Sequence, residues 1–279
     1  MNIDALFRYP VKSMLGESVD TCLVGERGVL GDRGYALVDQ ETGMVASAKN
    51  PRRWSVLFEC RAAYLEEPRD ASELPPVEIT GPGGETTRSD DPGAHEWLSR
   101  IVGRAVRLET KPPDGAKLEQ YRLPVEGFAE AHDDTVTDEA IAVVAPGTFF
   151  DAAPLHVVTT ATLSHLHELS PGTSFAPQRF RPNAVVAVGG ADGFVENDWV
   201  SRSIALGAEV QASVFLAAPR CVMTTLAQPD LPRDNGVLQT IARHNRFDIP
   251  GLGPSSCVGV YALVTRGGVM QQGAPVEIT

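Results

Sequence analysis

Short apolar runs separated by glycine and proline turns recur along the chain, and this pattern predicts strands rather than long helices. In the first half, the runs predict strands over residues 3–9, 19–24, 35–39, 44–48, 56–65 and 105–108. The turn between the third and fourth of these predicts a hairpin. One helix is predicted over residues 91–102, where Asp91 can cap the first turn and Pro92 fits it.

The second half repeats this style and adds two more helices. Its apolar runs predict strands over residues 141–144, 155–158, 185–188, 200–216 (a meander), 257–265 and 269–278. The last of these runs is expected to return and pair with the one before it. Thr159 or Thr160 can cap a helix whose Leu163 and Leu166 face inward, and a short helix is predicted over residues 236–245.

A polar stretch divides the two halves. Residues 111–139 are rich in proline and acidic side chains, which predicts a solvated linker and rim between two lobes. Many short strands with few helices favour barrel-like or sandwich lobes. We therefore expect a mainly β fold with a few short helices (α+β), divided into domains 1–112 and 113–279.

Composition narrows the possible functions. The formal net charge of −12 argues against a nucleic-acid-binding surface, which usually needs a positive face. The apolar stretches are too short to span a membrane, and no signal peptide is evident. Four scattered cysteines predict a reduced, cytoplasmic setting and argue against a zinc ribbon or an iron–sulfur domain. Three of them lie in apolar runs and are expected in the core: Cys22, Cys60 and Cys257.

Several familiar nucleotide-binding, metal-binding and hydrolase motifs are either absent from the chain or lack the sequence context that they need. The glycine-rich stretch 189–193 follows a strand, but no amphipathic helix follows it, so a turn is expected there instead of a nucleotide loop. His165 and His167 lie two apart on a predicted helix, roughly 200° around its axis, and cannot share one metal. No HExxH or GxSxG motif is present, so a zinc protease or an α/β-hydrolase has no support.

Positive charge recurs beside proline and glycine, at Arg33, Arg179 and Arg181. Such arginines are either solvated surface charge or part of an anion site, because a guanidinium matches phosphate oxygens with two hydrogen bonds. Lys12 and Ser13 follow the stiff Tyr-Pro pair at the end of the first strand. A lysine charge beside a rotatable hydroxyl would also suit a phosphate.

Cys221, in "AAPRCVMTT", is the sharpest candidate for chemistry. Most lone cysteines are simply buried apolar side chains. Here Arg220 would stabilise a thiolate, and Pro219 stiffens the approach to it. A thiolate is the ligand that a soft metal selects. It is also the nucleophile of a cysteine hydrolase, but no sequence signature pairs Cys221 with the candidate base His244.

Several sequence motifs resemble those of one family, and they occur in the same order across nearly the whole chain. "YPVKSMLGES" and "GERGVLGDRGYALVD" resemble the β-barrel domain that precedes a MOSC domain. "FRPNAVVA", "APRCVMTT" and "VGVYALVTRGGVMQQGAPVEI" resemble the MOSC domain itself. The layout is similar to the amidoxime-reducing molybdenum enzymes and their bacterial relatives.

The resemblance implies a pyranopterin molybdenum cofactor held between an N-terminal β-barrel lobe and a MOSC β-barrel lobe. By motif, Cys221 would be the protein thiolate on molybdenum. The reductases of the family often carry an acid where this chain has Thr160. Pyridoxal phosphate binding is a further property that the resemblance implies. The expected cofactor-binding residues come from both lobes: Lys12, Ser13, Arg33, Thr159, Thr160, Arg179, Arg181, Asn183 and Arg220.

The same resemblance implies an oxidoreductase that reduces N-hydroxylated or N-oxide substrates by oxygen-atom transfer at the cysteine-ligated molybdenum. No ferredoxin-like extension is seen, so electrons are expected from a separate partner: a ferredoxin, a flavoprotein or a b-type cytochrome. The alternative is a cofactor carrier or sulfurtransferase-type MOSC protein, in which Cys221 docks the cofactor or carries a persulfide.

Overall fold

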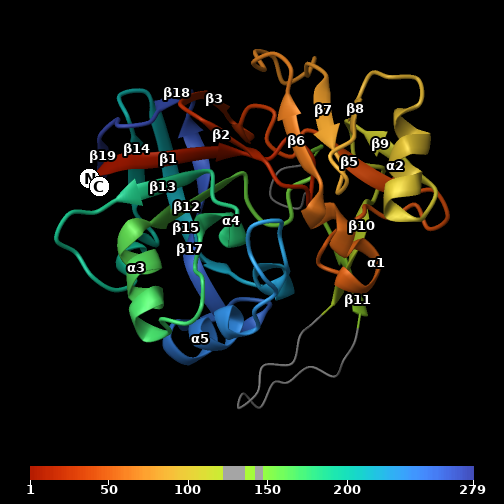
Figure 1. Ribbon diagram of the computed structural model, residues 1–279. Helices are drawn as coiled ribbons and strands as arrows, with labels where there is room; N and C mark the ends of the chain where they lie inside the picture. The colour runs from red at the N-terminus through yellow and green to blue at the C-terminus, as the bar shows by residue number, and fades with distance from the viewer. Residues whose placement is uncertain (122–135, 142–146) are drawn as a thin grey trace.

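The computed structural model describes residues 1–121, 136–141 and 147–279, which form two adjoining lobes (Figure 1). The large lobe is built on a nine-stranded sheet in the order β19-β14-β15-β17-β12-β13-β1-β2, with β16 also paired to β17. Its strands are β1 (Asn2–Arg8), β2 (Glu17–Val19), β12 (Leu155–Thr159), β13 (Ala184–Ala187), β14 (Ser203–Leu206), β15 (Val210–Pro219), β16 (Arg246–Ile249), β17 (Gly253–Arg266) and β19 (Val276–Ile278).

Short helices cover part of this sheet (Figure 1). They are α3 (Thr160–Leu169), α4 (Pro177–Phe180), η2 (Val195–Trp199), η3 (Val222–Thr225) and α5 (Gly236–His244). Thr159 caps α3, because its side chain accepts a hydrogen bond from the backbone of Thr162 at 3.1 Å. Leu166 is buried and Leu163 half-buried, as predicted. Together with α5, this helix buries an apolar cluster against β12 and β17.

The small lobe contains most of the first half of the chain. Its strands form three small sheets, β5-β9, β6-β7-β8 and β10-β11. The bounds are β5 (Ala36–Asp39), β6 (Arg61–Tyr64), β7 (Val77–Thr80), β8 (Thr86–Arg88), β9 (Val106–Glu109), β10 (Lys117–Tyr121) and β11 (Val136–Ala140), with α1 (Pro51–Trp54), η1 (Ser55–Glu59) and α2 (Ala94–Val102). Apolar residues of these elements, among them Leu57, Ile79 and Leu98, form a separate core.

The N-terminal segment ties the two lobes together. β1 pairs with β13 and with β2 inside the large sheet. β3 (Thr21–Gly25) pairs with β4 (Gly28–Val29) and with β18 (Gly268–Gln271). Ile3 and Leu6 therefore pack in the core of the large lobe, beside second-half residues such as Leu155. The chain then leaves β1 at Tyr9 and enters the small lobe, so residues 9–14 lie where the lobes meet.

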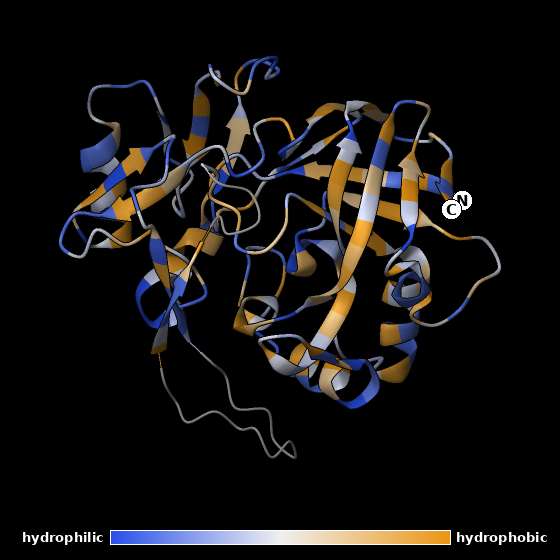
Figure 2. Cartoon of the chain, turned by 180° about the vertical axis from the view of Figure 1, so that it is seen from behind, coloured by the Kyte–Doolittle hydropathy of each residue, from blue (hydrophilic) through white to orange (hydrophobic). Residues whose placement is uncertain are grey.

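The predicted fold class is confirmed: the chain is mainly strands with a few short helices. The hydropathy colouring shows apolar residues concentrated along the central strands (Figure 2). No described helix is long and apolar enough to cross a membrane. The helix predicted over 91–102 is found as α2, but Asp91 does not cap it. Its carboxylate instead accepts a hydrogen bond from the backbone of Arg88 at 2.9 Å.

Four predictions of strands need correction. Residues 56–65 are not one strand, because a 3₁₀ turn that buries the consecutive Leu57 and Phe58 precedes β6. The run 19–24 is split into β2 and β3. The hairpin predicted across 35–48 is present but short: Val38 bridges Val45, and backbone hydrogen bonds join Asp39 to Met44 and Ala46 to Leu37, so residues 44–48 do not form a full strand.

The fourth correction concerns the C-terminal run. Residues 269–278 do not pair with β17, because β12 and β15 already occupy both of its edges. They divide instead into β18, beside β3, and β19, beside β14.

The predicted linker also contains structure. β10 and β11 pair with each other over residues 117–121 and 136–140, so the described part of this stretch contains a two-stranded sheet and is not only a solvated rim. The predicted acidic positions Glu126, Glu130, Asp133 and Asp134 lie outside the described residues, as does most of the strand predicted over 141–144.

A glycine in the middle of β17 is expected to be indispensable for stability. Gly259 has φ +77°, and a Cβ there would lie 2.5 Å from both His156 Nε2 and the Val157 carbonyl oxygen. Gly259→Ala is expected to lower the free energy of unfolding by about 2–4 kcal/mol, from overpacking and an unfavourable backbone conformation together. Gly43 is a matched control, with φ +71° and open space around it, and Gly43→Ala should cost only about 1 kcal/mol. Denaturant unfolding measures the free energy of unfolding of both variants. An equal decrease in the two variants would contradict the close packing inferred around Gly259.

Candidate functional site

A cavity of about 580 Å³ opens where the two lobes meet. Both lobes contribute to its wall, since residues 12–13, 33, 49 and 121 lie opposite residues of β15, β17 and α5. The structure brings eight of the ten predicted site residues into this wall: Lys12, Ser13, Arg33, Arg179, Arg181, Asn183, Arg220 and Cys221. The remaining two, Thr159 and Thr160, do not line it.

Cys221 lies in this wall just after the end of β15, as the residue that precedes η3. Its carbonyl oxygen accepts hydrogen bonds from the Thr224 backbone and side chain, at 3.1 and 3.0 Å. The side chain is half-buried, whereas the other three cysteines are buried, as predicted. Burial raises the pKa of Cys60 and Cys257 to about 11, which makes those two thiols poor nucleophiles and poor ligands. Among the four cysteines, Cys221 is therefore the thiol that the cavity can use.

Arg220 is anchored by the protein around it. Its Nε donates to the Ala218 carbonyl at 3.0 Å, its Nη1 to the Phe180 carbonyl at 3.0 Å and its Nη2 to the Tyr261 hydroxyl at 2.9 Å. The backbone N–H of Arg220 donates to the Ser256 carbonyl at 2.7 Å. These bonds fix the strand end that presents Cys221 and hold a positive charge in the wall beside it.

Two arginines stack on one buried tyrosine. The guanidinium carbons of Arg33 and Arg181 lie 4.6 and 4.2 Å from the centre of the Tyr9 ring. Both residues adopt positive φ, 49° and 56°, an uncommon conformation for a residue with a side chain. One arginine comes from each half of the chain, so this stack is a contact between the lobes.

Arg181 keeps an unused hydrogen-bond donor. Its Nη1 donates to the Met14 carbonyl at 2.6 Å, but its Nη2 is buried without a hydrogen-bond partner among the described residues. Burial, together with the nearby Arg33 charge, lowers the pKa of Arg181 to about 10. A buried cation with a spare N–H is costly unless an anion completes it.

A single carboxylate organises this region. Asp32 is buried and accepts hydrogen bonds from the Tyr9 backbone and from the Asn183 side chain, both at 2.8 Å. It also forms an ion pair with Arg33. Asn183 in turn accepts a hydrogen bond from the His156 backbone at 3.1 Å. Asn183 therefore orients the wall by way of Asp32 and His156.

Lysines complete the positive wall. Lys12 donates to the Phe149 carbonyl at 2.7 Å and pairs with Asp151, and burial lowers its pKa. Lys49 lies 3.4 Å from Asp151 and 3.3 Å from Glu139. Burial opposes its charge, but the negative charges of Asp151 and Glu139 outweigh this effect and raise the pKa of Lys49. Lys49 thus adds a cation to the cavity wall that also contains Cys221.

Sequence reasoning missed Lys49 and Asp151. Lys49 follows the apolar run 44–48, and Asp151 follows two phenylalanines, so both read as ordinary ends of apolar segments. No local signal joins positions 49, 151 and 221. The sign of the wall charge is nevertheless the one predicted: most charged groups of the wall are cations, in a chain whose net charge is −12.

Arg179 stabilises the backbone around the site. Its guanidinium donates to four backbone carbonyls, those of Ser174 (2.9 Å), Thr224 (3.2 Å), Leu226 (3.2 Å) and Pro232 (2.7 Å). It therefore fastens the segment that follows Cys221.

The predicted hydroxyl residues have structural partners of their own. Ser13 has φ 64° and accepts a hydrogen bond from the Ala48 backbone at 3.1 Å. Thr159 caps α3 and donates to Glu196 at 2.6 Å, and Thr160 accepts a bond from the Val188 backbone at 3.4 Å.

Comparison with known families agrees with this architecture. Residues 1–104 match the MOSC N-terminal beta barrel domain, and residues 145–277 match the MOSC domain. The chain is a MOSC-domain protein with an N-terminal MOSC β-barrel domain. The domain boundary predicted at 112 and 113 falls between the two matches and stays a prediction.

Relatives align with this MOSC protein over nearly its whole length. It is 25% identical to mitochondrial amidoxime reducing component 2 of Bos taurus, over 98% of this chain and 82% of the relative. It is 24% identical to mitochondrial amidoxime-reducing component 1 of Homo sapiens, over 98% of this chain and 81% of the relative. These comparisons give the expected pyridoxal phosphate binding no support.

Two solved structures show a distant likeness. The YuaD protein from Bacillus subtilis has a TM-score of 0.46 at 10% identity, over 99% of this chain and 93% of that one. YiiM from Geobacillus stearothermophilus has a TM-score of 0.31 at 19% identity, over 46% and 54%.

The role of Arg179 can be tested by removing its guanidinium. Arg179→Met keeps the apolar stem and leaves four carbonyls without their donor, so the free energy of unfolding is expected to fall by about 3 kcal/mol or more. Proteolysis is expected to become faster in the segment 221–232. The exposed Arg202 serves as the control, and Arg202→Met should change stability by less than about 0.5 kcal/mol. An Arg179→Met protein with unchanged stability and proteolysis would contradict the role.

Proposed function

We propose that this MOSC protein binds a pyranopterin molybdenum cofactor in the cavity between its lobes and reduces N-hydroxylated or N-oxide compounds. The observation that carries the proposal is the pairing of one half-buried thiol, Cys221, with a mostly cationic wall. The amidoxime-reducing names of both relatives support the reaction class.

The residues present fit such a group. Cys221 offers a soft thiolate ligand, which suits molybdenum. The buried Arg181 Nη2, which has no hydrogen-bond partner within residues 1–121, 136–141 and 147–279, offers a donor that an anionic pterin phosphate would satisfy. The groups that would hold the cofactor are Cys221 for the metal, with Lys12, Ser13, Arg33, Arg181 and Asn183 for the pterin and its phosphate.

When bound, the cofactor supplies two-electron redox chemistry and oxygen transfer. In sum, the N-oxygenated substrate takes up two electrons and two protons and yields the reduced nitrogen compound and water. The chain's own part is positioning and charge. Lys49 adds positive charge to the wall, and Arg220 and Arg179 fix the backbone that presents Cys221.

The proposed reduction consumes two electrons per substrate. We propose a separate electron-transfer protein as the donor, either a ferredoxin, a flavoprotein or a b-type cytochrome. The presence of four free cysteines fits a reducing compartment and supports the proposed cytoplasmic location.

A second function shares the same residues. Cys221 could carry a persulfide in a sulfurtransferase-type protein, or the cavity could only carry the cofactor. The mostly cationic wall around Cys221 suits this chemistry as well. The two functions differ in turnover, because only the reductase consumes N-oxygenated compounds.

Replacement of the thiol tests the proposal. Protein made in a host that synthesises the cofactor is expected to contain molybdenum and pterin, and Cys221→Ala should lose most of the metal, since its only predicted protein thiolate is gone. Elemental analysis and pterin fluorescence measure both, and a chemical electron donor with a hydroxylamine-type substrate measures turnover. Cys60→Ala, a buried cysteine of the other lobe, is the matched control and should retain the metal.

Each outcome has a distinct meaning. Molybdenum retained in Cys221→Ala contradicts the assignment of Cys221 as ligand. Cofactor bound by the wild-type protein without turnover of any N-oxygenated compound contradicts the reductase and favours the carrier.

A further inference from the structure

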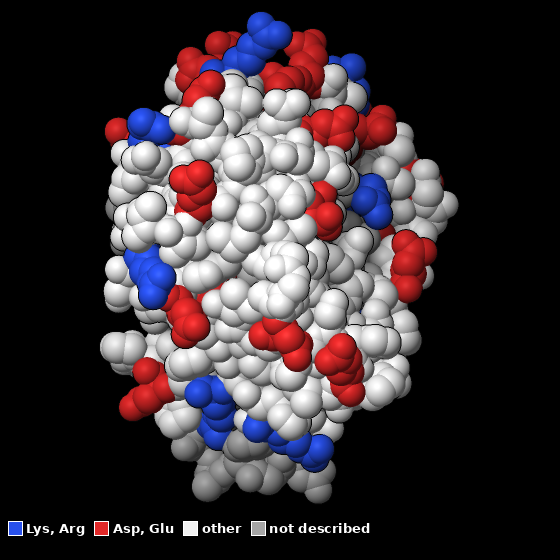
Figure 3. Space-filling model, turned by 90° about the vertical axis from the view of Figure 1, so that its left-hand side faces the viewer, with Lys and Arg blue, Asp and Glu red and all other residues white. Residues whose placement is uncertain are grey.

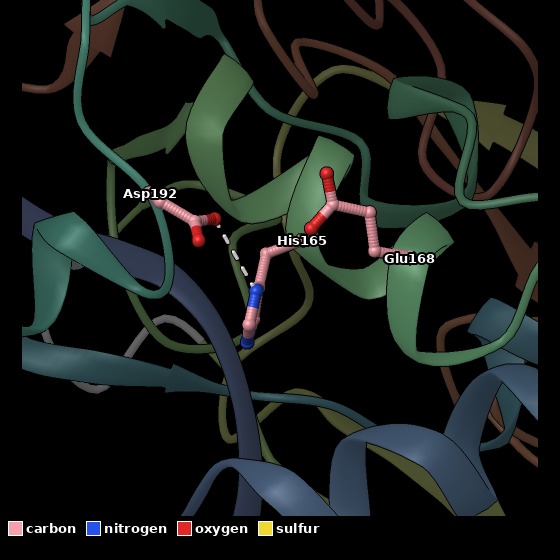
Figure 4. A group of neighbouring side chains, drawn as sticks. All are labelled: His165, Glu168 and Asp192. Carbon is pink, nitrogen blue, oxygen red and sulfur yellow. Dashed lines mark ion pairs between the residues drawn. The ribbon is translucent and has the colours of Figure 1, made fainter.

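Away from the cavity, three side chains with metal-ligand atoms converge on the surface of the large lobe. His165 and Glu168 lie on α3, and Asp192 lies on the loop between β13 and η2 (Figure 4). One ligand atom from each of the three lies within 4.8 Å of the others. The cavity wall includes none of these residues.

Local structure brings the three together. His165 and Glu168 are three residues apart on a helix, so they share one face. The loop that carries Asp192 turns through two glycines with positive φ, Gly190 at 70° and Gly193 at 84°. The backbone of Gly193 donates to the Asp192 carboxylate at 2.7 Å, which holds that carboxylate toward the helix.

The His165 imidazole is held by a ring contact, and its Nδ1 is available as a metal ligand. The ring of Phe194 meets the His165 ring edge-on, with centres 5.2 Å apart and planes at 87°. His165 Nδ1 is shielded from solvent and has no hydrogen-bond partner among the described residues. It lies 3.3 Å from Asp192 Oδ1, without the alignment of a hydrogen bond. Such a shielded nitrogen, facing a carboxylate but not bonded to it, is placed as a metal ligand would be.

We propose that His165, Glu168 and Asp192 form a site for a divalent cation of borderline softness, represented by Zn²⁺. One imidazole and two carboxylates are donors that Zn²⁺ accepts, and three protein ligands leave a position for water. Ligand atoms around a tetrahedral zinc lie about 3.3 Å apart, so small rotations of the exposed Glu168 and Asp192 side chains close the site. Hard cations such as Mg²⁺ and Ca²⁺ prefer sites made of oxygen alone.

Such a site would fasten the 189–194 loop to α3. The loop leads directly into η2, whose Glu196 accepts hydrogen bonds from Thr159 and Thr162 at the start of the same helix, both at 2.6 Å. The metal would thus add a second clamp, toward the other end of α3. This inference does not depend on the proposed reaction in the cavity.

Titration with zinc chloride tests the site. The full chain is used with Cys221→Ser, so that the cavity thiol does not compete, and binding is followed by calorimetry. One site is expected, and His165→Ala or Asp192→Asn should weaken it by at least about tenfold, since even indirect partners of a metal ligand contribute that much. His167→Ala is the matched control, a histidine on another face of the same helix, and should bind zinc as the parent does.

Three results would overturn the proposal. The first is identical titration of the parent and the His165→Ala variant. The second is equal weakening by His167→Ala. The third is tighter binding of Mg²⁺ or Ca²⁺ than of Zn²⁺ at these residues. Circular dichroism of each variant establishes that the fold is retained, so that loss of binding reports the ligands themselves.

Discussion

The buried carboxylate of Asp32 is the contact on which the rest of the site depends. It accepts a backbone bond from Tyr9 at the end of β1, pairs with Arg33, and accepts a bond from Asn183 of the second half. Three segments far apart in sequence are therefore fixed by one side chain. A buried charge is tolerated only when it is paired and hydrogen-bonded, so the loss of any one of these partners would leave the Asp32 carboxylate less well compensated.

That constraint explains why the cavity can be basic in an acidic protein. Arg33 and Arg181 both stack on Tyr9, and their repulsion is offset by Asp32 and by the negative side of the ring quadrupole. Over the face seen in Figure 3, by contrast, acidic and basic side chains are interspersed around a broad uncharged area. Most charged residues of the wall between the lobes are cations, and the lower dielectric there strengthens their effect on an anion.

The sequence predicts those features that local patterns encode. Local patterns predict the cap at Thr159, the buried strands β12 and β13 and the core positions of three cysteines. They also predict the set of motifs that meet at the cavity. Features set by long-range pairing are not. Residues 269–278 form strands as predicted, but their partners depend on which sheet edges remain free. Lys49 and Asp151 likewise become site residues only through folding, which pairs Asp151 with Lys12 and Lys49 in the wall that contains Cys221.

The proposed cofactor binding requires an anion at Arg181 Nη2, the buried nitrogen that has no hydrogen-bond partner in the described part of the chain. Pterin content per folded chain, compared among wild type, Arg181→Lys and Arg181→Leu, tests it most directly. The account predicts that Arg181→Leu folds but loses most of the pterin, while Arg181→Lys, which keeps the charge without the guanidinium fork, retains an intermediate amount. Full pterin content in Arg181→Leu would contradict the account.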